Sequence, residues 1–269
     1  PRIYNYARTP AQIAWSYNRG GPIGWYKFDE CTGAIAYDSS GRGNNGTITP
    51  GAGTHTSVGL CNSGSASEMW DDGQTGKRNY SLDFDGGDDY VDMNDVAAFD
   101  SNNSDFAIAG WFNRETFTTD DTIVAKRNGV ANTDDGYIVY IDDSTDKLTF
   151  EVSDNADTDE YQIESTSTFT STGWNHFLII WDDDAEANTT IYINGVKENV
   201  TRTGTLANIG DLSNAVDFRI GGESDTASDS PFAGELDDIM VFNYVLTAQQ
   251  VRNVFSQSAL RFGPSEGSP

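Results

Sequence analysis

Acidic residues crowd the stretch "DFDGGDDYVD", and their spacing is the first feature of the 269-residue chain that suggests chemistry. Ca²⁺ takes roughly six to eight oxygen ligands, and carboxylates are the commonest of them. Gly86 and Gly87 permit a tight turn that gathers Asp85, Asp88 and backbone carbonyl groups around one cation, with Asp89 beside them. The spacing is not that of the EF-hand loop. A calcium site and a solvated hairpin turn therefore remain equal alternatives here.

A second acidic pair, Asp237 and Asp238, lies within the strand-like run "LDDIMVFNYV". Neighbouring residues of a strand point to opposite faces, so we expect one of the two side chains to face the core side and the other to face solvent. A carboxylate that faces inward needs a partner. We expect that partner to be a cation, Lys27 or Arg219.

Sugar recognition requires aromatic platforms with polar groups around them. Trp70, in the polar stretch "SEMWDDGQ", is the first candidate, because nothing around it resembles a core segment, and Tyr161 is a weaker one. The other tryptophans in strand-like runs are expected to pack in the core. The alternative for Trp70 is a ring folded under its own loop.

Motifs of nucleophilic and cofactor chemistry are absent from the sequence. It contains no G-x-S-x-G elbow, P-loop or dinucleotide fingerprint. The two histidines, His55 and His176, are too few and too far apart in the chain for a metal triad.

The elements that must position these residues are strands. Short β-branched and aromatic runs alternate with Gly, Asn, Asp and Ser, as in "YSLDF", "FAIAGWF", "YIVYI", "KLTFEV" and "TTIYINGV". Asn194-Gly195 is the preferred two-residue hairpin turn. A chain this long with so many short strands predicts an antiparallel β-sandwich.

The chain also repeats part of itself. "RIYNYARTPAQI" at residues 2–13 aligns without gaps with "MVFNYVLTAQQV" at residues 240–251, and each copy predicts a short strand, a Thr N-cap and a helix with capping-box spacing. We therefore expect residues 1–22 to be the tail of a preceding repeat plus a linker, residues 23–256 to form one module, and residues 257–269 to be a second linker.

The amino-acid composition limits the kinds of partner that the chain is expected to bind. Asp and Glu number 42 against 16 Lys and Arg, which gives a formal charge of −26 at pH 7. Such a surface repels phosphate and attracts cations, so we expect neither nucleic acid nor an anionic membrane as a partner. No run reaches the roughly 18 apolar residues of a membrane span. Calcium binding or solubility in salt fits the charge, and plain solubility is the alternative.

The two cysteines, Cys31 and Cys61, predict a disulfide that pins the first loop, provided that the protein is extracellular. Two buried thiols of a cytosolic protein are the alternative.

The order of these motifs resembles a known family. "GWYKFDE", "AYDSSGRGNNGT", "YSLDFDGGDDYV", "GWNHFLIIWD" and, most specifically, "GELDDIMVFNYVLTAQQV" are similar to laminin-G-like, concanavalin A-like jelly rolls of bacterial surface proteins and, more distantly, to pentraxins. The resemblance implies two curved antiparallel sheets with one short C-terminal helix. It also implies a secreted module, often in tandem and often binding calcium or carbohydrate, and a buried, hydrogen-bonded imidazole at His176.

The resemblance adds site candidates. Glu223, Asp225 and Asp229 occupy a place similar to the acidic calcium loop of pentraxins, with a solvated loop as the alternative. Asp29 and Glu30 lie near the first strand, where an ion commonly sits in this superfamily. The related glucanases carry E-x-D-x-E on one strand. Here Glu235 and Asp237 match its start and the second Glu is missing, so the catalytic pair of a retaining glycosidase is incomplete.

Together these observations predict a calcium-stabilised, extracellular carbohydrate-binding or adhesion module, one unit of a tandem-repeat protein whose partners are a glycan and neighbouring copies. A glycoside hydrolase or polysaccharide lyase of the same superfamily, and a ligand-free structural spacer, are the alternatives.

Overall fold

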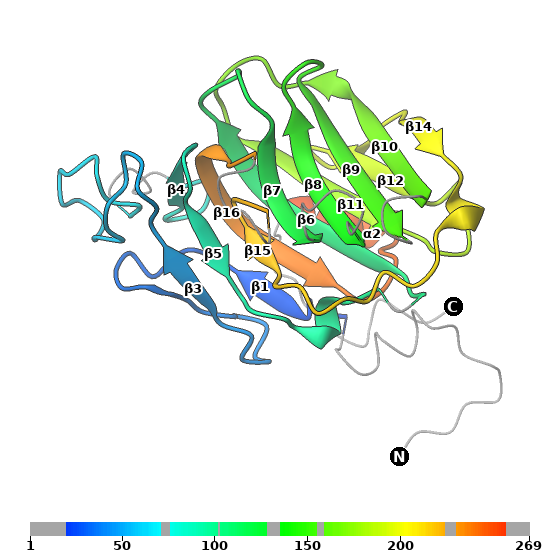
Figure 1. Ribbon diagram of the computed structural model, residues 1–269, viewed down its shortest axis with the longest axis horizontal. Coiled ribbons are helices and arrows are strands. Elements are labelled where there is room, and N and C mark those ends of the chain that lie inside the picture. The colour runs from blue at the N-terminus through cyan, green and yellow to red at the C-terminus, as the bar shows by residue number, and fades with distance from the viewer. Residues whose placement is uncertain are drawn as a thin grey trace.

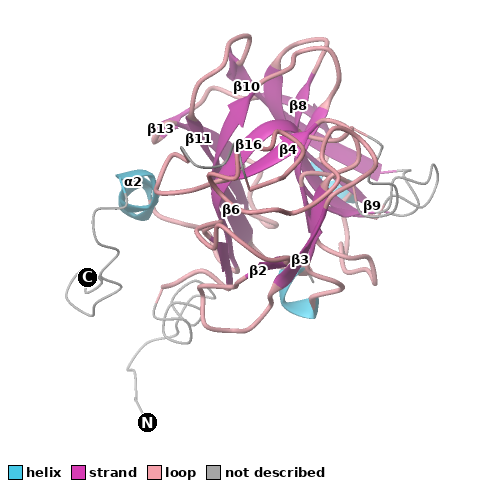
Figure 2. Ribbon diagram, turned by 90° about the vertical axis from the view of Figure 1, so that its left-hand side faces the viewer, coloured by secondary structure: helices cyan, strands magenta, loops and turns pink. Residues whose placement is uncertain are grey.

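The computed structural model describes residues 20–70, 76–101, 103–127, 135–154, 159–223 and 230–256, and they form a sandwich of two antiparallel sheets. This confirms the predicted jelly roll with one short C-terminal helix. The nine-stranded sheet faces the viewer in Figure 1, and helix α2 (Ala248–Ser256) lies behind the sandwich. Figure 2 shows the two layers from the side, with α2 outside the seven-stranded sheet. The predicted preceding-repeat tail and the C-terminal linker lie outside the described residues, except for residues 20–22.

The seven-stranded sheet is centred on two long strands. The order is β1 (Gly24–Tyr26), β16 (Ala233–Phe242), β6 (Phe106–Arg114), β11 (Asn175–Trp181), β12 (Thr190–Ile193) and β13 (Val196–Lys197), with β4 (Leu82–Asp85) also paired to β16. The first and last strands of the module are therefore neighbours: Gly24 lies opposite Val241.

The nine-stranded sheet contains a meander of four consecutive strands, β7 to β10, flanked on both sides by strands from other parts of the chain. Its order is β14 (Thr201–Gly204), β10 (Asp159–Thr168), β9 (Lys147–Asp154), β8 (Gly136–Asp142), β7 (Asp121–Arg127), β15 (Arg219–Ile220), β5 (Tyr90–Asp92), β3 (Gly46–Thr49) and β2 (Ile35–Ala36). Two short 3-10 helices, η2 (Ala97–Phe99) and η3 (Leu206–Asn208), join strands at the rim.

The core lies between the sheets because alternate residues of each strand point inward. Phe150 of β9, Phe177 of β11 and Ile239 of β16 are fully buried in it. A second apolar cluster lies on the other side of the seven-stranded sheet, where Ala107 and Ala109 of β6 are small enough for α2 to approach. The amphipathic helix buries its apolar face there.

Local sequence signals explain two of the chain reversals. Asn194 and Gly195 both have positive φ and join β12 to β13, which confirms the predicted hairpin turn. At the start of α2, Gln250 N–H donates to the Thr247 hydroxyl at 3.3 Å, and the Gln250 side chain accepts from Thr247 N–H at 2.8 Å. The predicted capping box therefore exists in the second copy of the repeat.

The predicted disulfide is also present: Cys31 and Cys61 are joined and close a loop of the first part of the module. Within the described residues, no helix is long and apolar enough to cross a membrane.

Candidate functional site

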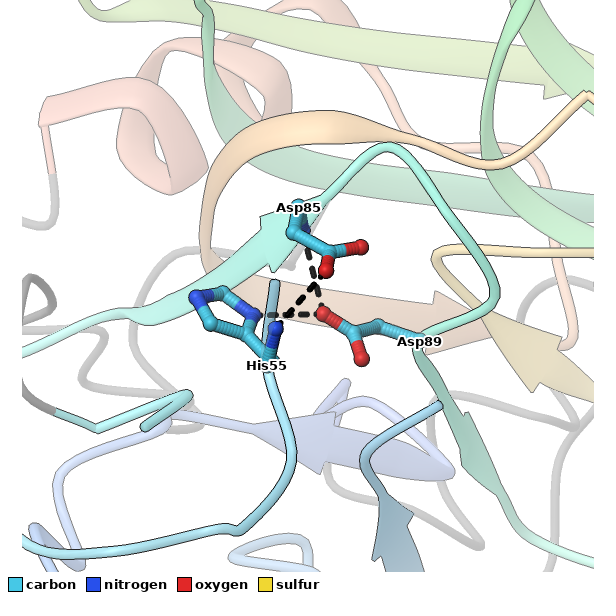
Figure 3. A group of neighbouring side chains, drawn as sticks. All are labelled: His55, Asp85 and Asp89. Carbon is cyan, nitrogen blue, oxygen red and sulfur yellow. Dashed lines mark hydrogen bonds and ion pairs between the residues drawn. The ribbon is translucent and has the colours of Figure 1, made fainter. Parts of the chain in front are cut away.

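A buried histidine lies among aspartates where the loop at residues 50–56 meets the end of β4 (Figure 3). His55 Nδ1 is 2.5 Å from Asp89 Oδ2, and Nε2 is 3.3 Å from Asp83 Oδ2. His55 and Asp89 are 2% and 1% exposed. One oxygen each of Asp85 and Asp89 and one ring nitrogen of His55 lie within 4.8 Å of one another.

Backbone amides hold these carboxylates in place. Asp85 accepts from the N–H groups of His55 and Gly87, each at 2.8 Å. Asp89 accepts from Gly51 N–H at 2.8 Å, and Asp88 accepts from Ala52 N–H at 2.7 Å. The sequence folds this way because the glycine-containing turn after β4 places successive carboxylates against the amides of the loop at residues 50–56.

This arrangement bears on the calcium site expected from Asp85, Asp88 and Asp89. Burial lowers the pKa of His55, but hydrogen bonds from the ring to Asp83 and Asp89 outweigh it and raise that pKa to about 10. The ring is then an imidazolium at neutral pH, and the carboxylates have cationic and amide partners. An imidazole among the donors is also foreign to Ca²⁺, which prefers oxygen alone. The fit to calcium is poor here.

The pair Asp237–Asp238 is arranged differently from the expectation. The ladder between β16 and β6 shifts between Asp237 and Met240, and Asp238 has φ of 51°. This bulge breaks the alternation of the strand, so both side chains are buried, at 0% and 2% exposed. The prediction that one faces solvent is therefore wrong.

The partners of this pair also differ from those expected. Asp237 accepts from Arg78 N–H at 2.7 Å, while Asp238 accepts from the Trp25 indole at 2.8 Å and lies 3.7 Å from Arg78 Nε. Arg219, one of the two expected partners, instead donates to Asp92 at 3.1 Å. Arg78 was missed because its distance from the pair in sequence gives no local signal.

Unpartnered oxygen atoms remain at this bulge and in the segment after β1. Oδ1 of Asp237, Oδ1 of Asp29 and Oε2 of Glu30 are buried and have no hydrogen-bond partner. Burial, with the nearby charges of Asp238 and Asp29, raises the pKa of Asp237 to about 8. Lys27 supplies one positive charge, 2.6 Å from Asp29 Oδ2. Oxygen atoms with unused acceptors are the type of donor that Ca²⁺ takes.

Glu235, the partial match to the glucanase signature, has a carboxylate neighbour after all. Asp83 of β4 lies directly opposite it in the sheet. However, Glu235 is only 6% exposed and accepts hydrogen bonds from Ser81 at 3.0 Å and from Asn113 at 2.8 Å. The two carboxylates are sealed by side chains that already satisfy Glu235, an arrangement that leaves a substrate no access.

The outer face of the nine-stranded sheet carries a chain of paired polar side chains. Arg127 contacts Glu151 across the sheet and lies 3.8 Å from Glu223. Tyr140 donates to Glu151 at 3.4 Å and accepts from Gln162 at 3.1 Å. We call this surface, with the neighbouring pair on β15 and β5, the polar face; its residues are Tyr90, Arg127, Tyr140, Glu151, Gln162, Arg219 and Glu223.

The polar face continues onto β5 through Arg219. Its guanidinium lies over the Tyr90 ring, 4.3 Å from the centroid, and donates to the Glu223 carbonyl at 3.0 Å. The strands from β5 to β10 are each separated by about 4.8 Å, so the polar face is about 24 Å long across the sheet.

Hydroxyl groups without partners lie on the same side of the sheet. Thr122, Thr149 and Ser153 are fully buried, and their hydroxyl oxygens have no hydrogen-bond partner. Thr122 and Thr149 lie opposite Tyr140 on β7 and β9, so they form the floor beneath the longer side chains. These hydroxyls are covered, and it is the tyrosine rings and Arg–carboxylate pairs above them that suit a ligand rich in hydroxyl groups.

The two expected ligand-binding aromatics are not on this surface, and both predictions need correction. Trp70 and Tyr161 are each 0% exposed and belong to the core between the sheets. The Trp70 indole donates to the Gly33 carbonyl at 2.9 Å, so the polar stretch around it covers a buried ring. Tyr161 occupies an inward position of β10, where neither face of its ring is available to a ligand.

The remaining residues that were expected to bind a metal do not lie in one group. Glu223 lies on the polar face next to Arg127, at 7% exposure, rather than in an acidic cluster. Asp225 and Asp229 lie outside the described residues. The expected hydrogen bond of His176 is not found at Nδ1, which is buried without a partner. Tyr140, Glu151 and Gln162 were missed, although their positions as alternate residues of strand-like runs were a signal that they face outward.

Comparisons with known proteins identify the family to which this fold belongs. Residues 85–252 match the family model described as the concanavalin A-like lectin/glucanases superfamily. No curated protein sequence matches the chain closely enough to count as a relative.

Solved structures share the fold at low sequence identity. The binding domain of Paraclostridial Mosquitocidal Protein 1 has a TM-score of 0.61 at 13% identity, over 89% of this chain and 53% of that one. The binding domain of botulinum neurotoxin serotype D, solved with N-acetylneuraminic acid, has a TM-score of 0.61 at 13% identity, over 92% and 53%. This chain thus spans about half the length of these toxin domains.

A third solved structure, a domain of an enzyme, matches this chain over most of the length of both proteins. Domain 4 of AbnA, an extracellular arabinanase from Geobacillus stearothermophilus solved with arabinotriose, has a TM-score of 0.56 at 19% identity, over 87% of this chain and 98% of that one. Identities this low establish the fold and leave the ligand to be argued from the side chains.

Proposed function

The chain belongs to the concanavalin A-like lectin/glucanase superfamily, and from that premise we propose that it is a carbohydrate-binding module whose site is the polar face. The observation that carries the proposal is the row of outward tyrosine, arginine and carboxylate side chains, in which Tyr140 and Arg127 contact Glu151 and Arg219 lies over Tyr90. Support also comes from the similar domains solved with N-acetylneuraminic acid and with arabinotriose.

The charge pattern favours a neutral glycan. Arg127 is paired with Glu151, and Arg219 is paired with Asp92, so neither guanidinium is set aside for an anionic group. The chain as a whole carries a formal charge of −26, which repels acidic polysaccharides at long range. Tyr90 and Tyr140 offer rings against which the apolar face of a sugar can pack.

Binding to a panel of soluble neutral and acidic polysaccharides tests the proposal. We expect affinity for at least one neutral polymer, measured by calorimetry or by affinity electrophoresis. Tyr140→Ala removes a ring and the hydroxyl that links Glu151 to Gln162, so we expect affinity to fall by about tenfold or more, the cost of losing about 1.4 kcal/mol of contacts.

The matched control is Tyr37→Ala, because Tyr37 is 57% exposed and follows the edge strand β2, away from the polar face. Its affinity should equal that of the unmodified chain. If no neutral glycan binds, or if both tyrosine substitutions weaken binding equally, the polar face is not the site.

We also propose that calcium stabilises the module at the Asp238 bulge, through Asp237 and Asp29 with Glu30 nearby. Buried, unpartnered oxygens on all three side chains support this placement. When bound, the cation supplies the positive charge that this oxygen group lacks. It would tie the segment after β1 to β16.

Thermal unfolding at fixed ionic strength, with EDTA and after calcium is restored, tests the calcium proposal. An ion at a hundredfold excess over its Kd stabilises by about 2.7 kcal/mol, which raises the midpoint by several degrees. Asp29→Asn should abolish the calcium-dependent shift, while Asp88→Asn, in the other acidic loop, should retain it. The reverse result would move the calcium site to the turn after β4.

The setting proposed for this module is extracellular. The Cys31–Cys61 disulfide supports an oxidising compartment, and the similar arabinanase domain comes from an extracellular enzyme. The match between residues 2–13 and residues 240–251 supports a tandem arrangement with neighbouring copies, and hence a role in adhesion. Mass and limited proteolysis of the full natural protein would test whether modules of this size recur.

A further inference from the structure

The geometry points to a second metal site, distinct from the calcium bulge: we propose that His55, Asp85 and Asp89 bind a borderline divalent transition metal, with Zn²⁺ as the representative ion. The site uses one ring nitrogen and two carboxylate oxygens. It does not depend on glycan binding by the polar face.

The donor atoms are already gathered. One ligand atom from each of the three residues lies within 4.8 Å of the other two, so a single ion between them reaches all three with small side-chain adjustments. His55 and Asp89 are almost fully buried. Three protein ligands of N and O type, with a water molecule in the fourth position, form a common zinc coordination.

The second nitrogen of the ring has the partner that metal-binding histidines usually have. Nε2 of His55 lies 3.3 Å from Asp83 Oδ2. A carboxylate that accepts from one ring nitrogen fixes the tautomer and directs the other nitrogen to the metal. The ion would take the place of the proton that Nδ1 shares with Asp89 in the metal-free chain, so binding would release one proton to solvent. Here Asp83 turns Nδ1 toward Asp89, on the side where Asp85 also lies (Figure 3). Asp83 is thus a positioning residue of the site.

The scaffold is rigid and comes from segments far apart in the chain. Asp85 accepts from His55 N–H, and Asp89 accepts from both Gly51 N–H and Asp85 N–H. An ion here would clamp the loop at residues 50–56 to the end of β4 and the start of β5. That loop has little regular structure of its own, so a clamp is a direct way to fix it.

The donor atoms of this site favour a transition metal over calcium. Imidazole suits Zn²⁺ and related metals, whereas Ca²⁺ prefers oxygen ligands in larger number. Charge favours a divalent ion, because Asp83, Asp85 and Asp89 surround a single imidazole. Other ligands of soft metals are scarce: both cysteines of the chain are in the disulfide, and the second histidine, His176, is buried elsewhere.

The test is a titration of the tag-free, chelator-treated chain with ZnCl₂, followed by NMR of the imidazole nitrogens and by thermal unfolding. We expect one equivalent of Zn²⁺ to shift the His55 ring resonances and to raise the unfolding midpoint, while the His176 resonances stay unchanged as an internal control. CaCl₂ at the same concentration should leave the His55 resonances unchanged.

Matched substitutions locate the site. Asp85→Asn removes a ligand and Asp83→Asn removes the positioning carboxylate, and each should weaken Zn²⁺ binding by about tenfold or more. Asp88→Asn changes the same charge in the same turn and should bind as the unmodified chain does. The proposal is overturned if Zn²⁺ leaves the His55 resonances unchanged, if Asp85→Asn and Asp88→Asn behave alike, or if Ca²⁺ reproduces the zinc response.

Discussion

The two outer faces of the sandwich differ in what covers them. The seven-stranded sheet presents small and apolar residues outward, such as Ala109 and Leu178, and α2 lies across them. The nine-stranded sheet presents Tyr140, Glu151 and Gln162, which bind one another instead of a helix. In one fold, a helix covers one outer face and paired polar side chains cover the other.

The difference between the two outer faces arises from the side chains at a few outward positions of the strands. On β6, alanines at the outward positions allow a helix backbone to come close. On β8 and β9, outward tyrosine and glutamate side chains hold off a packed element and satisfy their polar groups laterally. Substitutions on the two faces should therefore change different measurements, and three predictions test this, from the largest expected effect to the smallest.

The largest effect is expected on the covered face. Val251 of α2 is fully buried against the sheet, so Val251→Asp places an unpaired charge in an apolar contact and should cost about 3–5 kcal/mol in the free energy of unfolding. Urea denaturation measures this cost. Arg252→Asp, at the exposed neighbouring position, should change stability by about 0.5 kcal/mol or less. Equal losses in the two variants would mean that α2 does not pack as described.

The second effect depends on pH. Burial, with the charge of Arg78, lowers the pKa of His176 to about 3. In the unfolded chain the ring has a pKa of about 6.5, so below that pH the unfolded state takes up a proton that the folded state refuses. The stability of the folded state is therefore lost as pH falls, by about 2 kcal/mol between pH 7 and pH 5.

His176→Phe isolates this contribution, because a phenyl ring preserves the contacts with Trp111 and Phe255 and cannot take up a proton. Its free energy of unfolding should fall less between pH 7 and pH 5 than that of the unmodified chain. Parallel pH profiles for the two proteins would show that His176 is not buried in its neutral form.

The smallest effect on stability is expected on the polar face. Glu151→Gln removes the charge that Arg127 contacts but keeps the shape of the side chain and a hydrogen-bond acceptor, and Glu223 remains near Arg127, so stability should fall by about 1–2 kcal/mol. Affinity for the bound glycan should nevertheless fall. Glu186→Gln makes the same change in a more exposed pair with Arg202 and should alter neither quantity. A large loss of stability in Glu151→Gln would assign this face a structural role.

Much of the fold was predictable because its signals are local. The Asn194-Gly195 turn, the Thr247 capping box and the strand-like runs each depend on a few adjacent residues, and the structure contains all of them. The Cys31–Cys61 disulfide followed from there being only two cysteines.

The site was less predictable because its contacts join residues that are distant in sequence. His55 meets Asp85 and Asp89 only after the loop at residues 50–56 folds against β4. The residues next to His55 in the sequence give no sign of this contact. Trp70 shows the reverse error: its polar neighbours suggested exposure, whereas the loop buries the ring against the core. The Asp238 bulge inverts the expected direction of one side chain, which strand alternation alone cannot foresee.

The pairing of the first strand with the last has a mechanical consequence. Ile23 N–H donates to the Val241 carbonyl, and the Tyr244 hydroxyl donates to the Gly20 carbonyl, so the beginning of β1 and the end of β16 lie at the same corner. Tension applied between residues 20 and 244 would load these bonds one at a time and peel β1 away, as a zipper opens. Extension beyond β1 would soon meet the Cys31–Cys61 crosslink, which prevents the enclosed loop from lengthening while the rest of the sandwich stays folded.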